Sequence, residues 1–427
     1  MKKEEIAVFW FRRDLRLHDN YGLYNALQSG YKVLPIFIFD EAILSELPKN
    51  DARVSFIYET LNSINNELLK VGASIKIEKG TVFEVWKALL ENFNIKEVYT
   101  NKDYEPYAIQ REATLQSFFS EEGVSFKTFK DQVIFEEAEI VKEDGLPYTV
   151  YTPYKNKWLK QFSESTLDKF PSENYLENLL KENFDFPSLN EIGFQQSEIK
   201  VLPYNNRCIT DYEKNRDIPS IETSNLSVHL RFGTVSVRKL VAFAIKTNAT
   251  FTSELIWREF FMQILYHFPK VVHQNFREKY NYIPWRNNET EFKLWCEGKT
   301  GYPIVDAGMR QLNKTGYMHN RVRMIVASFL TKHLLIDWRL GEAYFAQKLL
   351  DFELSANNGN WQWAAGTGCD AAPYFRVFNP TTQQQKFDPD FKYINKWNPN
   401  YKSIPEIVEH KFARERYLNS VKESFIN

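Results

Sequence analysis

The sequence predicts an α/β N-terminal domain with a mostly parallel, doubly wound, Rossmann-like sheet, followed by an all-α C-terminal domain. Up to about residue 130, short runs of β-branched and aromatic residues alternate with segments of helical period, which is the pattern of βαβ units. From Tyr212 onward, apolar residues recur at helical spacing nearly throughout. A chain of 427 residues with 43% hydrophobic side chains can bury a core in each part.

Five segments of the first part have the composition and length of strands. They are residues 6–11, 33–39, 74–78, 97–100 and 125–129, and helical period is clearest over 55–71 and 82–93. The carboxyl ends of parallel strands meet at one edge, so Phe11, Asp40 and Asn101 are expected to border a ligand-binding edge. No GxGxxG or P-loop pattern occurs there, so a dinucleotide or nucleoside triphosphate is not indicated.

Residues 131–205 differ from both parts because they are acidic and have weak periodicity. Pro171 and Pro187 interrupt this stretch further. We therefore expect three regions: an α/β domain at residues 1–130, an inter-domain connector at 131–205 and a helical domain at 206–427.

The net charge of −1 conceals an asymmetry between the halves of the chain. Residues 1–200 hold 24 Lys/Arg and 33 Asp/Glu, a balance of −9, whereas residues 201–427 hold 30 and 22, a balance of +8. The basic half also carries seven of the ten tryptophans, and cations among aromatic rings can neutralise phosphates while the rings stack on bases. Nucleic-acid binding is one interpretation; the other is that the tryptophans are core residues and the cations ordinary surface.

Cysteine usage and the N-terminus bear on the compartment. Cys208, Cys296 and Cys369 show no CxxC or Cys/His spacing, so neither a disulfide framework nor a metal site is expected. The chain passes from Met1 almost directly into a predicted strand without the apolar region of a signal peptide, and no later apolar run approaches membrane-spanning length. We therefore expect a cytoplasmic protein with no membrane partner.

Two groups in the helical part suggest ligand binding. Residues 223–227 (Thr-Ser-Asn-Leu-Ser) place hydroxyl and amide groups ahead of a helical segment, which can bind a diphosphate or simply cap the helix. Glu254, Trp257 and Arg258 share one helical face, so the carboxylate can hydrogen-bond a ligand stacked on the indole. The alternative is an intrahelical Glu254–Arg258 ion pair.

Cations, amides and indoles occur together over residues 317–324, at Trp338 and over 357–363, a mixture that suits a flavin, a nucleic acid and an electron route. Further motifs accompany them, at 11–20 (FRRDLRLHDN), 300–310 (TGYPIVDAGMR), 320–324 (NRVRM) and 370–380 (DAAPYFRVFNP). Together they resemble the photolyase/cryptochrome family, densely over 212–398, with class I photolyases for cyclobutane pyrimidine dimers as the best match. The resemblance implies a monomeric lyase that repairs pyrimidine dimers in damaged DNA with light and bound FAD.

The resemblance also implies which residues hold the FAD. Arg323 and Asp351 match a charged pair against the isoalloxazine ring, where Arg323 can stabilise a reduced flavin; a simple buried ion pair is the alternative. Asn357 matches the residue that faces flavin N5, where an amide favours the fully reduced state because it is not an acid. The other implied FAD residues are Tyr212, Thr223, Ser224, Asn225, Leu226, Ser227, Phe251, Arg258, Asn320, Phe352 and Glu353.

Three tryptophans, Trp361, Trp338 and Trp285, match the family's electron chain from the flavin to the surface. The resemblance implies that this chain reduces a resting, oxidised flavin in light and takes no part in the repair step. Without the resemblance, all three would be interpreted as core residues.

The implied lesion site uses a further set of side chains. Trp257 and Trp363 would sandwich the flipped bases, with Met324 packed beneath them. Glu254 and Asn320 would hydrogen-bond the base edges, and Glu254 would need a raised pKa to act as a donor. The implied phosphate-binding cations are Arg216, Arg321 and Arg376.

Rival functions remain open at this point. A cryptochrome-type blue-light sensor without repair activity would share the fold and the flavin. Photolyases for the six-four photoproduct carry a His-His pair where this chain has His319-Asn320, so the dimer is the better match. A non-catalytic redox or DNA-binding flavoprotein is a third possibility. A second, antenna chromophore would bind at the strand ends of the N-terminal domain. Tyr107 and Ala108 replace the Asn-Glu of folate-binding members, and the segment is more similar to that of deazaflavin-type members; deazaflavin, methenyltetrahydrofolate, FMN or no antenna are all open.

Overall fold

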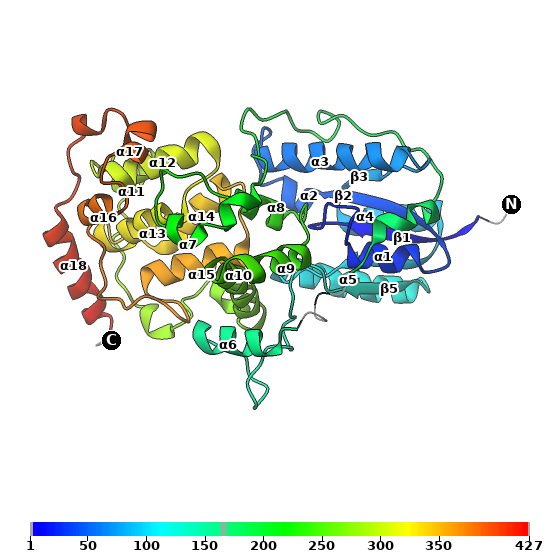
Figure 1. The fold of residues 1–427 in the computed structure, drawn as a ribbon, viewed down its shortest axis with the longest axis horizontal. Coiled ribbons are helices and arrows are strands. Elements are labelled where there is room, and N and C mark those ends of the chain that lie inside the picture. Colours follow the sequence, from blue (N-terminus) through cyan, green and yellow to red (C-terminus); the bar gives the residue numbers. More distant parts are fainter. Residues whose placement is uncertain (1–2, 164–166, 168, 426–427) are drawn as a thin grey trace. The chain divides into compact units, whose positions relative to one another are not determined.

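The computed structural model describes residues 3–163, 167 and 169–425, and the chain forms two compact units (Figure 1). The first consists of Met1–Glu136, Gln161–Leu202 and Leu226–Phe243, and the second of Glu137–Lys160, Pro203–Asn225 and Ala244–Asn427. The chain therefore passes between the units five times. Because both units take residues from the stretch 131–205, the three-region division of the sequence stays a prediction.

The first unit contains five parallel strands in the order β3-β2-β1-β4-β5. They are β1 (Glu5–Phe11), β2 (Lys32–Asp40), β3 (Lys76–Gly80), β4 (Asn94–Asn101) and β5 (Ser125–Phe129). The predicted parallel α/β sheet is thereby confirmed. Since all strands run in one direction, Phe11, Asp40 and Asn101 end at the same edge of the sheet.

Helices α1 (Tyr21–Leu27) and α4 (Val82–Asn92) pack on opposite faces of this sheet. The other helices of the first unit are α2 (Glu41–Leu44), α3 (Ala52–Leu69), α5 (Pro106–Glu121), α8 (Leu226–Arg231) and the start of α9 (Val237–Thr247). Trp10 packs edge-on against Trp86 of α4, with ring centroids 5.7 Å apart, while its neighbour Phe9 faces Gly22 of α1. Burial on both faces explains why β1 is a continuous apolar run and does not alternate with polar residues.

Strand β3 begins two residues later than the sequence predicts, at Lys76. The backbone N–H of Ile75 donates to Asn65 Oδ1 at 3.0 Å, and the hydroxyl of Ser74 donates to the Glu182 carbonyl at 3.0 Å. Both residues are buried but are held by side-chain hydrogen bonds outside the ladder, so the apolar pattern alone overestimates the strand.

The second unit is helical, as predicted. Its helices are α6 (Tyr151–Gln161, ending at the unit boundary), α7 (Tyr212–Asn215), α10 (Ala249–His267), α11 (Glu289–Cys296), α12 (Pro303–Thr315), α13 (Asn320–Ser328), α14 (Trp338–Lys348), α15 (Leu354–Ala365), α16 (Pro380–Phe387), α17 (Lys392–Trp397) and α18 (His410–Glu423). A short π-helix, Phe329–His333, continues α13. Among the described residues, no helix is both long and apolar enough to cross a membrane.

Helix α6 lies in the stretch whose weak periodicity did not indicate a helix. Its buried residues are only Tyr151, Tyr154 and Trp158, spaced i, i+3 and i+7 on one face. The rest of the helix is polar, and three large aromatic side chains do the packing. A helix with so narrow an apolar stripe gives little signal in a count of hydrophobic residues.

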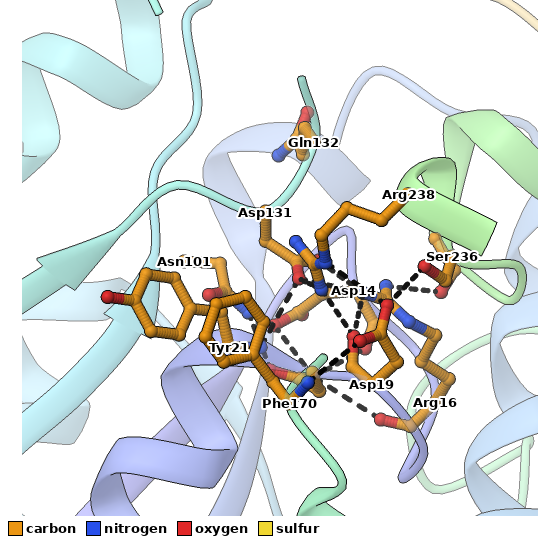
Figure 2. A network of polar contacts seen from close by, with 12 residues as sticks. Asp14, Arg16, Asp19, Tyr21, Asn101, Asp131, Gln132, Phe170, Ser236 and Arg238 are labelled. Atoms are coloured by element: carbon orange, nitrogen blue, oxygen red, sulfur yellow. Dashed lines mark hydrogen bonds and ion pairs between the residues drawn. The ribbon is translucent and has the colours of Figure 1, made fainter. Parts of the chain in front are cut away.

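A buried ion network holds the first unit together after the end of β1 (Figure 2). Arg16 donates to both oxygens of Asp131 at 2.7 Å, and Arg238 donates to Asp131 at 2.8 Å. Arg238 also pairs with Asp19 at 3.1 Å, and the Ser236 hydroxyl donates to the same carboxylate. The network joins the loop after β1, the segment after β5 and the first turn of α9, which are distant in sequence.

Candidate active site

A cavity in the second unit is lined by residues of α13, α14, α15 and the loop before α15. Nine residues predicted to bind flavin, to bind DNA or to transfer electrons line this cavity: Asn320, Arg323, Met324, Asp351, Phe352, Glu353, Asn357, Trp361 and Trp363. The structure thus brings these residues together in one place, although their roles stay predictions.

The N-cap of helix α13 determines which residues of this helix line the cavity. The backbone N–H of Arg321 donates to His319 Nδ1 at 3.2 Å, so the imidazole serves as the N-cap. Burial lowers the pKa of His319 to about 4, so the ring is neutral at pH 7 and keeps the lone pair that the cap requires. With the helix started there, Asn320, Arg323 and Met324 share one face and line the cavity.

A charged pair forms part of the cavity wall. Arg323 donates through Nη2 to Asp351 Oδ2 at 2.8 Å and through Nε to the Met318 carbonyl at 2.8 Å. The other carboxylate oxygen, Asp351 Oδ1, is buried and has no hydrogen-bond donor among the described residues. Leaving such an acceptor unsatisfied costs about 1–3 kcal/mol, so this atom indicates a ligand that donates a hydrogen bond. The N–H on the pyrimidine edge of a flavin is such a donor, and these residues therefore fit FAD.

The amide of Asn357 is fixed by its neighbour on α14. Its Nδ2 donates to Glu342 Oε1 at 2.8 Å and to the Glu342 carbonyl at 3.1 Å. Burial raises the pKa of Glu342, and the hydrogen bond from Asn357 opposes that rise. Both N–H groups of the amide are used, so its oxygen is the remaining polar atom of this cavity-lining side chain.

The three tryptophans of the predicted electron route belong to the same region of the core. Trp361 and Trp338 are buried members of one apolar cluster, and the half-buried Trp285 packs against it. Trp338 donates through Nε1 to Asn275 at 2.8 Å. Gly341, one turn after Trp338, meets the Trp361 ring so closely that an added Cβ would lie 2.2 Å from it. Helices α14 and α15 therefore approach each other at this glycine.

Gly341→Ala is expected to reduce the free energy of unfolding by about 1–3 kcal/mol, because the new methyl group overpacks the contact with Trp361. The displaced Trp361 should also slow light-driven reduction of bound flavin. Denaturant unfolding and the rate of photoreduction test these effects, with Ala343→Ser on the exposed side of α14 as the control. Equal behaviour of the two variants would contradict the expected effect of the added methyl group.

Glu254 forms an ion pair with Arg216 at 2.7 Å. The alternative expected from helical spacing was an intrahelical ion pair with Arg258. The Glu254 side chain is about 30% exposed. Burial raises the pKa of Glu254 above its ordinary value, while Arg216 acts in the opposite direction. The predicted direction of this shift is confirmed, so the carboxyl group holds its proton to higher pH than an exposed glutamate does.

Trp257, also on α10, is stacked against a residue that sequence reasoning missed. The rings of Tyr151 and Trp257 are parallel to within 9°, with centroids 3.6 Å apart. The spacing of Tyr151, Tyr154 and Trp158 was the one available signal of this contact. No local pattern identifies the stacking partner, because α6 and α10 are far apart in the sequence.

The predicted phosphate-binding cations have different surroundings. Arg321 pairs with Asp217 at 2.6 Å, and its guanidinium lies 4.4 Å from the Phe387 ring centroid. Arg376 is exposed, and its carbonyl accepts a 2.8 Å hydrogen bond from Lys332. Burial lowers the pKa of Lys332 to about 7.

The other predicted FAD residues lie outside the cavity. Thr223, Ser224 and Asn225 end a segment of the second unit, whereas Leu226 and Ser227 begin α8 in the first. Binding of a diphosphate by this cluster stays a prediction. On α10, Phe251 is buried and Arg258 half-buried, and the Tyr212 ring meets Phe251 edge-on with centroids 5.1 Å apart.

The carboxyl edge of the sheet, where an antenna was predicted, carries a polar cluster. Tyr107 donates to Asp40 at 2.6 Å and Arg111 donates to the same oxygen at 3.0 Å. The guanidinium of Arg111 also lies 5.0 Å from the Trp10 ring centroid. Which chromophore, if any, this edge accommodates stays a prediction.

Comparison with known proteins gives a consistent picture. A family model described as the FAD binding domain of DNA photolyase matches residues 251–423, and one described as DNA photolyase matches residues 7–173. Curated relatives named deoxyribodipyrimidine photo-lyase include one from Halobacterium salinarum, 37% identical, covering 95% of this chain and 92% of the relative. Another, from Escherichia coli, is 36% identical and covers 95% and 91%.

Solved structures resemble the whole chain as well. A class III photolyase from Agrobacterium tumefaciens is 30% identical with a TM-score of 0.87, covering 100% of this chain and 99% of that one. An archaeal photolyase from Sulfolobus tokodaii with two FAD molecules is 33% identical with a TM-score of 0.83, covering 98% and 100%. A cryptochrome from Synechocystis is 25% identical with a TM-score of 0.81, covering 99% of each chain.

Proposed function

Because the chain belongs to the DNA photolyase family, whose FAD-binding domain it carries, we propose that it splits cyclobutane pyrimidine dimers in DNA by light-driven electron transfer. One observation supports this most strongly. A single cavity is lined both by residues expected at the flavin, namely Arg323, Asp351 and Asn357, and by residues expected at the dimer, namely Met324 and Trp363. A flavin and a dimer bound there would be close enough for direct electron transfer.

When bound, reduced and excited by blue light, FAD supplies the electron that opens the cyclobutane ring. The protein's part is to hold charge and exclude water. Arg323 places a fixed cation beside the position expected for the ring, where it stabilises negative charge. Asn357 offers an amide and no acidic proton, so the reduced state is not lost to protonation by this side chain.

Access to the dimer requires it to leave the duplex, which costs a few kcal/mol and less for an already distorted lesion. Trp257 and Trp363 would recover part of this cost by contact with the extruded bases. Arg216, Arg321 and Arg376 would hold the flanking phosphates, in agreement with the charge balance of +8 over residues 201–427. We further propose that the protein is a monomer. We also propose that it lies in the cytoplasm, where its three free cysteines would stay reduced.

A cryptochrome-type blue-light sensor is the second candidate, because a Synechocystis cryptochrome resembles the chain over its whole length. The two functions differ in a simple assay. The FAD-loaded, reduced protein is mixed with a short DNA that contains one thymine dimer, illuminated with blue light and followed by the recovery of thymine absorbance. Recovery that requires light supports the repair enzyme, whereas a photoreducible flavin without recovery supports the sensor.

Replacement of Glu254 tests the proposed hydrogen bond to the dimer. Glu254→Ala should lower the repair yield roughly 3–10-fold, the range expected for loss of one ordinary hydrogen bond, and leave FAD bound. Because the folded-state pKa of Glu254 is raised, the donor is present at low pH and is lost as the pH rises through that pKa. The repair yield of the wild type should therefore fall with rising pH, and that of Glu254→Gln should not. A pH-independent wild-type yield would rule out the donor role.

A further inference from the structure

Tyr151 is the residue that covers one face of Trp257. The two rings are stacked with a centroid distance of 3.6 Å and an interplanar angle of 9°. The Tyr151 hydroxyl donates to the Ser253 carbonyl on α10 at 2.7 Å, one turn before Trp257. Tyr151 is thus attached to the helix that carries the indole as well as to the indole itself.

Further contacts hold the Tyr151 ring in this position. The backbone N–H of Tyr151 donates to Asp370 Oδ2 at 3.0 Å, in the motif that also contains Arg376. Along α6, the Tyr154 ring packs on Phe260 with centroids 5.3 Å apart, and Trp158 donates through Nε1 to Glu259 at 2.7 Å. All three buried residues of α6 therefore contact α10, and Tyr151 is 7% exposed.

This arrangement decides how Trp257 can be used. An indole has two faces, and the face against Tyr151 is closed to any ligand. Trp257 itself is only half-buried, so part of its surface stays accessible. The stacked tyrosine restricts rotation of the indole about χ2, together with the rings of Phe260 and Phe261, whose centroids lie 5.5 and 5.3 Å from that of Trp257. A ligand would otherwise have to restrict this rotation on binding.

We propose that Tyr151 is a positioning residue for lesion recognition: it fixes the plane of Trp257 so that an extruded pyrimidine dimer meets a rigid indole face. The proposal rests on the proposed function. The bases of a cyclobutane dimer have lost the aromaticity of their rings, so their attraction to Trp257 depends on close contact with a flat surface. A mobile indole would lose much of this contact, whereas undamaged DNA, which keeps its bases stacked in the duplex, would not be affected.

The test compares two dissociation constants for each FAD-loaded variant, measured in the dark. One is for a duplex with a single thymine dimer and the other for the same duplex without damage. Tyr151→Leu should weaken binding of the dimer duplex about 5–10-fold, the upper range for an aromatic pair, and leave binding of the undamaged duplex unchanged. Tyr151→Phe keeps the ring and should recover most of the selectivity. Should Tyr151→Leu fail to retain FAD, Tyr151→Met is measured with the same expectation.

Tyr154→Leu is the matched control, since Tyr154 shares the buried face of α6 and contacts Phe260. It should leave the ratio of the two dissociation constants unchanged even if it lowers stability. The proposal is overturned if Tyr151→Leu leaves the ratio unchanged, or if Tyr154→Leu lowers it equally, because then α6 acts only as packing. A wild-type protein that binds both duplexes equally would instead refute the proposed function itself.

Discussion

Trp338→Phe is expected to slow light-driven reduction of the oxidised, FAD-loaded protein by at least about 100-fold. Phenylalanine is far harder to oxidise than tryptophan, and each ~59 mV of added oxidation potential lowers the equilibrium constant for one-electron transfer tenfold. Trp338 is the predicted middle member of the route. It is buried in the cluster that contains Trp361, and Trp285 packs against that cluster with part of its surface exposed. In the predicted route, an electron enters at Trp285 and passes through Trp338 and Trp361 to the flavin.

The measurement is the rate of loss of oxidised-flavin absorbance under blue light with an external reductant. Protein that has been reduced chemically beforehand should repair dimer DNA at the wild-type yield, because repair does not use this route. Trp295→Phe is the matched control: Trp295 is buried and its ring centroid lies 6.1 Å from that of Trp361, but it is not part of the predicted chain. If Trp295→Phe blocks photoreduction and Trp338→Phe does not, the electron enters by a different path.

Asp131→Asn should lower the free energy of unfolding of the first unit by about 3–5 kcal/mol, the cost of removing one partner from a buried ion pair. Asp131 is 2% exposed and accepts hydrogen bonds from both Arg16 and Arg238, so the variant leaves two guanidinium groups short of a counter-charge. Denaturant unfolding measures the loss, with the exposed Glu121→Gln on α5 as the control. A loss no larger than that of the control would show that the network is replaceable.

The same variant has a defined pH dependence. Burial alone would raise the pKa of Asp131, but Arg16 and Arg238 hold it below its ordinary value of 3.8. Its contribution to stability is therefore fully present above pH 3.8 and disappears as the pH falls through the depressed pKa. The difference between wild type and Asp131→Asn should be constant from pH 5 to 8 and narrow below about pH 4. Asp14 behaves oppositely, since burial and the nearby Asp131 raise its pKa.

The sheet was predictable because its central strands β1 and β2 are buried on both faces and appear as continuous apolar runs. The edge strands β3 and β5 are only partly buried, and their alternation with helical segments indicated them and leaves few topologies. The ends of the elements were less predictable. The backbone N–H of Ile75 donates to the Asn65 side chain, and the Ser74 hydroxyl donates to the Glu182 carbonyl. These partners are distant in sequence, so no local pattern shows that β3 begins only after Ile75.

The candidate site was predictable where its residues lie in continuous motifs. Arg323 and Asn357 belong to segments with an unusual mixture of charge, amide and indole, whereas Asp351 was expected only from the family resemblance; one cavity is lined by all three. Tyr151 was missed because its importance lies in a partner on a distant helix, α10. Helix α6 was missed for the related reason that three aromatic residues provide all of its buried surface.

The interleaved course of the chain has a consequence during synthesis on the ribosome. At about 5–20 residues per second, Arg238 is made roughly 5–20 s after Asp131, although the two form one buried ion pair. Before Arg238 is translated, all five strands have already been made, and Asp19 and Asp131 still lack the Arg238 guanidinium. A nascent chain that ends between Asp131 and Arg238 therefore has Arg16 but not Arg238 to pair with Asp131, and we expect the sheet unit to become stable only when residues up to 243 have left the exit tunnel.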